Sequence, residues 1–247
     1  MVLRDKILVG LKSLRRGAGD LSRIFFPVCC HVCRKPLVEG EQLLCLDCMT
    51  KIPLTGFDRI PYDNPLHYRC VDLDCKIDKA VSFFYYKNES AYSRMIRDAK
   101  YYGRPQINRT LGRIFATHLR ATGFFDDIDL IIPVPVHWAR RLMRGYNQTE
   151  YIARGISEAT GIPVVGNLIA SRYHRSQTSR KATERREALR DNFKVIRADQ
   201  LTGKHILLVD DVITTGATIL TCGSAIYRAA AIERLSVLSL GAARLER

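Results

Sequence analysis

The chain has 247 residues, of which 47% are hydrophobic, and this is enough for one full domain and a small second one. No apolar run approaches the roughly 20 residues that a membrane-spanning helix needs, which excludes a transmembrane segment. The formal net charge of +14 favours an acidic partner, either nucleic acid or a polyphosphate substrate. A basic surface that only keeps the protein in solution would give the same charge.

Residues 1–25 form a basic segment that lacks the long apolar region and the small-residue cleavage site of a secretory signal. Its apolar residues have helical spacing: Leu3, Ile7, Leu8, Leu11 and Leu14. We expect a short amphipathic helix packed on the body of the protein. The alternative is a basic helix that lies on the inner face of a membrane.

Two Cys-x-x-Cys pairs follow, separated by eleven residues, namely Cys30/Cys33 and Cys45/Cys48. Eight cysteines without a secretory signal indicate a reducing, cytoplasmic compartment and metal binding rather than disulfides. Two such pairs complete a closed tetrahedral site, so residues 26–56 are predicted to form a structural zinc ribbon. The alternative is buried cysteines without metal. Cys29 would break the two-residue spacing. The remaining cysteines are interpreted as free thiols: Cys70, Cys75 and Cys222.

Residues 57–78 are expected to be a linker, and residues 79–247 to form the main domain. There, apolar and β-branched runs alternate with amphipathic ones. Strands are predicted at 79–86, 128–133, 164–169, 193–196, 206–209 and 235–240, the last one closing the sheet. Helices are predicted at 90–100, 111–121 and 145–160. This alternation predicts an α/β fold with a mainly parallel sheet and helices on both faces.

The run at 205–218 carries the clearest chemical signal. The apolar strand 206–209 is followed by the adjacent carboxylates of Asp210 and Asp211 and then by a small-residue loop. The loop consists of Thr214, Thr215, Gly216, Ala217 and Thr218. Open α/β sheets bind ligands at the carboxyl ends of their strands, and free N–H groups at a helix N-terminus bind anions. Two adjacent like charges repel each other, so stability alone does not explain them. The pattern indicates a sugar-phosphate site.

Two basic segments are candidates for the same site. Residues 140–148 contain three arginines and end in Asn147 and Gln148, just after the strand that ends at Pro133. Residues 172–190 contain seven lysines and arginines against two glutamates. The second segment is interpreted as a surface flap whose cations screen a diphosphate. The alternative is a solvated charged helix.

Together these motifs resemble the ComF family of competence-associated proteins, from about residue 26 to the C-terminus. The matching motifs are the four-cysteine ribbon, Ile131-Ile-Pro-Val-Pro135, Arg144-Gly-Tyr-Asn-Gln148, Ser176-Gln-Thr178 with Glu184-Arg-Arg186, and 207–218. The acidic loop alone looks like the phosphoribosyl diphosphate loop of type I phosphoribosyltransferases. The resemblance therefore implies a type I phosphoribosyltransferase-like domain preceded by a small zinc-ribbon module.

The resemblance also implies roles for residues. Asp210 and Asp211 would hold the ribose hydroxyls of phosphoribosyl diphosphate, with Mg²⁺ nearby, and Thr214 to Thr218 would bind the 5-phosphate. Val134 and His137 would lie in the diphosphate loop. Asn147 and Gln148 would contact the substrate or the nucleophile. The flexible catalytic loop would contribute Gln177, Thr178, Arg185 and Arg186.

The family is associated with DNA uptake during natural transformation, so single-stranded DNA and DNA-uptake proteins are the further partners implied. The chain is thus interpreted as a ComF-type protein with a phosphoribosyl diphosphate-binding domain. Whether it catalyses transfer, to which acceptor, and as which oligomer is left open. The alternative is a non-catalytic protein that binds single-stranded nucleic acid and keeps the pocket as a sensor or a relic.

Overall fold

The computed structural model describes residues 27–101, 103–136, 141–143, 145–170 and 192–244. The predicted N-terminal helix at 1–25 lies outside these residues. The chain divides into two compact units, Met1–Lys51 and Ile52–Arg247. Among the described residues no helix has the length and apolar character needed to cross a membrane.

The described part of the smaller unit, residues 27–51, consists of tight turns and the short helix α2 (Leu46–Thr50). Cys29 and Pro36 form an antiparallel bridge. Within that loop the Cys30 N–H donates to the Lys35 carbonyl at 2.8 Å, and the Arg34 N–H donates to the Cys30 carbonyl at 3.0 Å. These bonds turn the chain sharply, which brings the cysteines of the first pair to one side of the turn.

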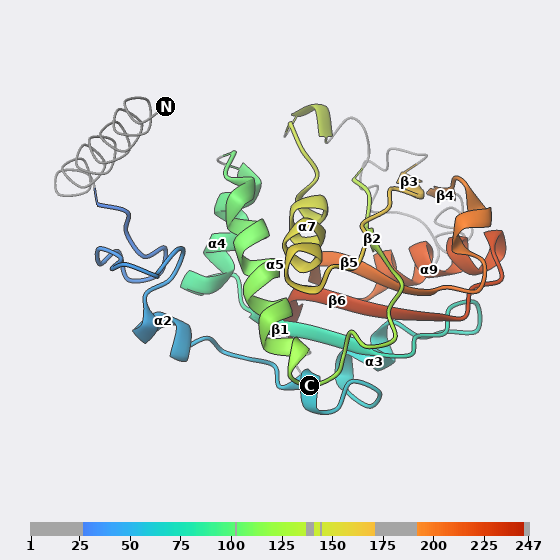
Figure 1. The fold of residues 1–247 in the computed structure, drawn as a ribbon, viewed down its shortest axis with the longest axis horizontal. Helices are drawn as coiled ribbons and strands as arrows, with labels where there is room; N and C mark the ends of the chain where they lie inside the picture. The colour runs from blue at the N-terminus through green and yellow to red at the C-terminus, as the bar shows by residue number, and fades with distance from the viewer. Residues whose placement is uncertain (1–26, 102, 137–140, 144, 171–191, 245–247) are drawn as a thin grey trace, which may run out of the picture. The chain divides into compact units, whose positions relative to one another are not determined.

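The larger unit is built on a four-stranded parallel sheet, in the order β1 (Ala80–Tyr86), β6 (Arg234–Ala243), β5 (His205–Ile213) and β2 (Leu130–Pro133) (Figure 1). The middle strands are buried on both faces, which explains their continuous apolar runs. The predicted parallel sheet is confirmed. However, β6 lies inside the sheet, between β1 and β5, instead of closing it.

The predicted strand at 164–169 is only partly present. Val164 forms a single parallel bridge with Ile131. The chain then leaves the sheet, and β3 (Leu168–Ala170) pairs antiparallel with β4 (Phe193–Val195) in a separate two-stranded sheet. Periodicity finds extended segments, but it does not say which sheet they join.

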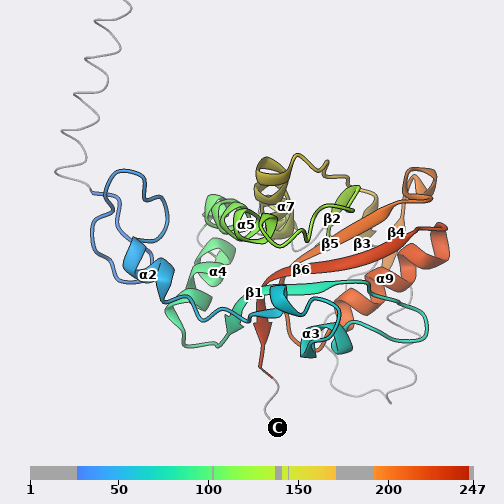
Figure 2. The same ribbon diagram turned by 60° about the horizontal axis from the view of Figure 1, so that its bottom comes forward.

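Helices cover both faces of the main sheet (Figure 2). After α4 (Ala91–Tyr101), the helices α5 (Pro105–Arg120) and α7 (Gln148–Thr160) lie side by side on one face. The other face carries α3 (Pro65–Arg69) and α9 (Ala217–Ala229). The second predicted helix began too late, at 111. The proline at 105 is the first residue of α5, a position where its fixed φ and missing N–H fit a helix.

Two glycines let α5 and α7 approach each other very closely. A Cβ atom at Gly112 would lie 2.5 Å from the Ile152 carbonyl oxygen, and one at Gly155 would lie 2.0 Å from the Arg109 carbonyl oxygen. Real Cβ atoms do not come this close to backbone, so any larger residue at either position would force the helices apart.

Residues 57–78, which were expected to be a linker, belong to the larger unit. They form η1 (Phe57–Arg59) and α3, and they contribute Phe57, Leu66, Cys70, Cys75 and Ile77 to the core under the sheet. The short elements and many charged residues of this segment hide its buried positions. A further turn, η2 (Ala198–Leu201), leads into β5.

Candidate functional site

The two adjacent carboxylates lie at the carboxyl end of β5, between β6 and β2. The predicted strand ended at Val209, but β5 continues through Asp210, which pairs with Ser239, to Ile213. Asp210 is buried and Asp211 is partly exposed. The Asp211 N–H donates to Asp210 Oδ1 at 2.8 Å, and the Val212 N–H donates to Asp211 Oδ1 at 2.7 Å. Backbone N–H groups therefore hold both side chains in place.

Burial and the charge of Asp211 raise the pKa of Asp210 to about 8. The Asp211 N–H and the Lys100 ammonium oppose this rise without cancelling it. Lys100, in the last turn of α4, has its Nζ 3.9 Å from Asp211 Oδ2. This distance is too long for a hydrogen bond, so the lysine is a nearby counter-charge rather than a fixed partner.

The loop after β5 has the features of an anion-binding site. Thr214, Thr215 and Thr218 are exposed, whereas Gly216 is buried and has a φ of +81°. The helix α9 begins directly afterwards, so its N-terminal end points toward this loop. Within the described part of the chain, the backbone N–H groups of Thr215 and Gly216 have no hydrogen-bond acceptor. Free N–H groups and hydroxyls together at a helix N-terminus suit a phosphate.

Arg69, the last residue of α3, lies behind this loop. Its Nη1 donates to the Thr214 carbonyl at 2.9 Å and to the Ala243 carbonyl at 2.8 Å. A Cβ atom at Gly216 would lie 2.1 Å from the Arg69 carbonyl oxygen, so only glycine lets the loop lie directly on α3.

The end of β2 is tied to the start of α7. The Val134 N–H donates to the Val209 carbonyl at 2.9 Å. The Val134 carbonyl accepts from Asn147 Nδ2 at 3.1 Å and from Thr149 Oγ1 at 2.6 Å. Asn147 also caps α7 by accepting from the Thr149 N–H. Val134 and Asn147 were both predicted to bind substrate. In the structure the Val134 carbonyl and the Asn147 side chain form hydrogen bonds with other protein groups instead.

Gln148 is also buried, and its Nε2 has no hydrogen-bond partner among the described residues. A cavity of about 470 Å³ lies beside the end of β2 and the first turns of α7. Its lining includes Pro133, Pro135, Asn147 and an ion pair in which Arg141 Nη1 lies 3.2 Å from Glu150 Oε1. This surface is therefore both polar and apolar.

Five predicted site residues lie outside the described part of the chain: His137, Gln177, Thr178, Arg185 and Arg186. Conversely, sequence reasoning missed Arg69 and Lys100. Lys100 ends a correctly predicted helix, and helix position alone gave no reason to place it near Asp211. Arg69 lies 145 residues before its partner Thr214, and no local pattern links residues so far apart.

The smaller unit contains the predicted metal cluster. One sulfur from each of Cys30, Cys33, Cys45 and Cys48 lies within 4.8 Å of the others, and the sulfurs of Cys33 and Cys45 are 3.6 Å apart. Burial raises the pKa of Cys30, but N–H groups of Cys33, Cys45 and Val32 outweigh it and lower the pKa to about 6. Four cysteine sulfurs this close together are the donor set of a structural zinc site.

The other cysteines lie outside this cluster. The Cys29 thiol donates to the Pro27 carbonyl at 3.4 Å, so the choice of Cys30 for the cluster is confirmed. Cys70, Cys75 and Cys222 are free thiols in the core of the larger unit, as predicted. Burial raises the pKa of Cys70 and of Cys75 to about 12, which makes them poor nucleophiles.

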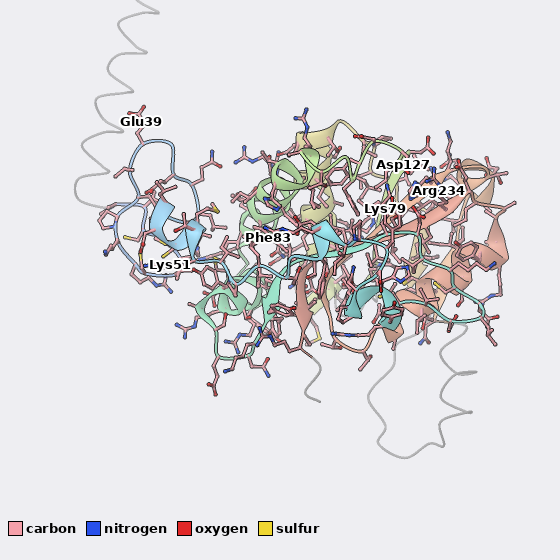
Figure 3. All side chains as sticks on the ribbon, turned by 90° about the horizontal axis from the view of Figure 1, so that it is seen from below. Glu39, Lys51, Lys79, Phe83, Asp127 and Arg234 are labelled. Atoms are coloured by element: carbon pink, nitrogen blue, oxygen red, sulfur yellow. The ribbon has the colours of Figure 1, made fainter. Side chains whose placement is uncertain are left out.

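A second group with metal-ligand chemistry, Asp78, Asp127 and His205, lies at the opposite, amino edge of the sheet. Lys79 Nζ is 2.6 Å from Asp127 Oδ1, and Arg234 Nη1 is 2.7 Å from Asp127 Oδ2. Figure 3 shows the labelled side chains of Lys79, Asp127 and Arg234 close together. Since two protein cations already neutralise Asp127, a divalent ion would have to displace them, and we interpret the group as a structural ion-pair network.

The burial of Asp210 predicts a pH dependence of stability. Its folded-state pKa of about 8 exceeds the unfolded value of 3.8, so the folded protein binds this proton more tightly. The free energy of unfolding should therefore fall as the pH rises from about 4 to 8, by up to about 1.4 kcal/mol per pH unit. Asp210→Asn should remove this slope and stabilise the protein most at pH 8 and above. Denaturant unfolding between pH 5 and 9 measures it.

Asp199→Asn, which changes an exposed carboxylate on η2, is the control and should keep the slope of the parent. Parallel pH curves for Asp210→Asn and the parent would contradict the assignment of the elevated pKa.

Comparison with known proteins gives sequence relatives over most of the chain. Competence protein F of Haemophilus influenzae is 29% identical over 229 residues, which cover 89% of this chain and 99% of that protein. ComFC of Streptococcus pneumoniae is 28% identical and covers 74% of this chain and 80% of its own. DNA utilization protein YhgH of Escherichia coli K12 is 26% identical and covers 84% and 95%. No model of a known protein family matches the chain.

Among solved structures, a glutamine phosphoribosylpyrophosphate amidotransferase from B. subtilis is similar at a TM-score of 0.41 and 22% identity. The match covers 58% of this chain but only 30% of that one. Over most of its length the chain is a relative of competence protein F and ComFC, which confirms the predicted resemblance to the ComF family.

Proposed function

We propose that the larger unit binds phosphoribosyl diphosphate, together with Mg²⁺, at the carboxyl edge of its sheet. The observation that carries the proposal is the pair Asp210 and Asp211, held directly beside a loop at the start of α9 whose N–H groups have no acceptor among the described residues. Carboxylates bind sugar hydroxyls, and N–H groups at a helix N-terminus bind phosphate. One sugar phosphate therefore satisfies both halves of the site.

In this proposal Asp210 and Asp211 accept hydrogen bonds from the ribose 2- and 3-hydroxyls. Thr214 to Thr218 hold the 5-phosphate. Carboxylate oxygens are ligands that Mg²⁺ prefers, so the acid pair also suits the metal that accompanies the diphosphate. Lys100, which balances the charge of Asp211 in the free protein, would be released when the cationic metal arrives.

The reaction would be a phosphoribosyl transfer. The bond between C1 of the ribose and the diphosphate oxygen breaks, the diphosphate leaves with the electron pair, and a nucleophile forms a new bond to C1. Positive charge develops on the sugar ring in this step, and in the proposed complex the carboxylate of Asp211, together with Asp210 once it has lost its proton to the incoming metal's charge, would stabilise it. Mg²⁺ and basic side chains, with Arg185 and Arg186 as the sequence candidates, would neutralise the diphosphate.

We further propose that this site serves DNA uptake or utilization. This proposal is supported by the sequence relatives, which are named as competence proteins and DNA utilization proteins. The net charge of +14 is consistent with a role near nucleic acid. Binding of single-stranded DNA without transfer chemistry is the competing function.

The proposed site predicts Mg²⁺-dependent binding of phosphoribosyl diphosphate, measured by calorimetry with and without Mg²⁺. The double variant Asp210→Asn/Asp211→Asn should lose about 100-fold in affinity or more, because each hydrogen bond between a carboxylate and a hydroxyl contributes about 1.5–3 kcal/mol. Asp199→Asn serves as the matched control and should bind like the parent.

Absence of binding in the parent protein would contradict the proposal. If such a protein instead binds single-stranded DNA with an affinity that falls steeply with salt, the competing function is correct.

The cellular role can be tested by complementation. Expression of this chain in Haemophilus influenzae that lacks its competence protein F should restore transformation frequency, and the Asp210→Asn/Asp211→Asn variant should not. Equal recovery with both proteins would separate the role in DNA uptake from the sugar-phosphate site.

We propose that the four-cysteine cluster binds one structural zinc ion. Purified protein should contain about one zinc per chain by metal analysis, because four thiolates form a closed tetrahedral site. Cys45→Ser should lower the zinc content, and removal of the metal with a chelator should unfold the smaller unit. Cys29→Ser should keep the zinc of the parent. Zinc-free protein with an unchanged smaller unit would refute the assignment.

A further inference from the structure

We infer that Arg69 is a positioning residue for the phosphate-binding loop, a role that rests on the proposed function. Arg69 belongs to α3, far from the loop in sequence. Its Nη1 donates both to the Thr214 carbonyl at 2.9 Å and to the carbonyl of Ala243, the last residue of β6, at 2.8 Å. One guanidinium nitrogen thus ties the loop to the end of the neighbouring strand.

The bond to Thr214 fixes the direction of the next N–H group. Every described peptide bond is trans, and in a planar trans peptide the carbonyl and the following N–H point in opposite directions. Arg69 holds the Thr214 carbonyl toward α3, so the Thr215 N–H points away from α3. Among the described residues this N–H has no hydrogen-bond acceptor. Arg69 therefore orients a donor that it never touches.

The backbone of Arg69 supports the same loop from behind. Gly216, with its φ of +81°, lies so close that a Cβ atom would be 2.1 Å from the Arg69 carbonyl oxygen. The position of α3 is fixed in turn by Asn64. Its Nδ2 donates to the Ala80 carbonyl of β1 at 2.9 Å, and its Oδ1 caps the helix by accepting from the N–H groups of Leu66 and His67. The loop thus rests on a support anchored to the sheet.

The charge of Arg69 also favours an anion in front of the loop. Within the described residues Arg69 forms no salt bridge, and its buried Nε has no hydrogen-bond partner. Among the described residues its acceptors are two carbonyl groups, and no carboxylate forms a salt bridge with it. A cation behind the Thr214–Thr215 peptide strengthens the N–H as a donor to phosphate.

The test compares the ligands phosphoribosyl diphosphate and ribose 5-phosphate, which share only the ribose and the 5-phosphate. Arg69→Met should weaken both by the same factor, about tenfold, as expected for the loss of one oriented, charge-assisted contact. Arg69→Lys, which keeps the charge and a donor, should retain most of the affinity. Arg59→Met, an exposed arginine of the same segment, should match the parent.

Amide NMR gives a readout that a purely structural role would not move. In the parent, ribose 5-phosphate should shift the Thr215 N–H resonance strongly, and in Arg69→Met this shift should be reduced while the protein stays folded. If Arg69→Met fails to fold, Arg69→Gln, which also removes the charge, takes its place and should show the same reduced shift, whereas Arg69→Lys should shift like the parent.

The outcomes separate the two proposals. Normal binding by Arg69→Met would overturn the role of Arg69 alone. Equal loss of affinity and of melting temperature in the Met and Lys variants would make Arg69 a merely structural residue. If the parent binds neither sugar phosphate, the proposed function is wrong and the inference about Arg69 is wrong with it.

Discussion

Two adjacent carboxyl groups at the end of a buried strand cannot both be charged without destabilising the protein, and the larger unit limits this cost around β5. Asp210 and Asp211 are restrained by backbone N–H groups, and Lys100 approaches from α4 to balance the charge. Burial still keeps the pKa of Asp210 near 8. Asp210 therefore keeps its proton at neutral pH in the free protein, and a carboxyl group with so large a pKa shift is typical of functional sites, where a ligand or metal supplies the missing partner.

The two edges of the sheet differ in a way that supports this interpretation. At the amino edge Asp127 contacts both Lys79 and Arg234, and His205 Nε2 lies 2.8 Å from the Ser236 hydroxyl. The charges there are matched within the protein. At the carboxyl edge, within the described residues, Lys100 is the cation near the acid pair, and N–H groups of the neighbouring loop have no acceptor. Among the described residues, the carboxyl edge combines an acid pair with N–H donors that lack an acceptor, and this combination suits a sugar phosphate.

Much of this arrangement could be predicted from the sequence, because the decisive signals are local. The apolar run before Asp210, the small-residue loop after it, and the paired cysteines each occupy a few consecutive residues. The errors concern properties that depend on distant residues. Charged surface positions in 57–78 masked the buried Phe57 and Leu66, and the pairing of β3 with β4 follows from geometry that no periodicity records. Arg69 could not be found either, because its partners Thr214 and Ala243 lie at the other end of the chain.

The glycine contacts between α5 and α7 bear on how the site could respond to a ligand. Because the two backbones touch at Gly112 and Gly155, neither helix can slide or rotate against the other without a steric clash. The layer on this face of the sheet is therefore a rigid base. Adjustment to a ligand is left to side chains outside this layer, such as Lys100. A rigid base of this kind would let the protein distinguish ligands by fit at the loop rather than by rearrangement of its core.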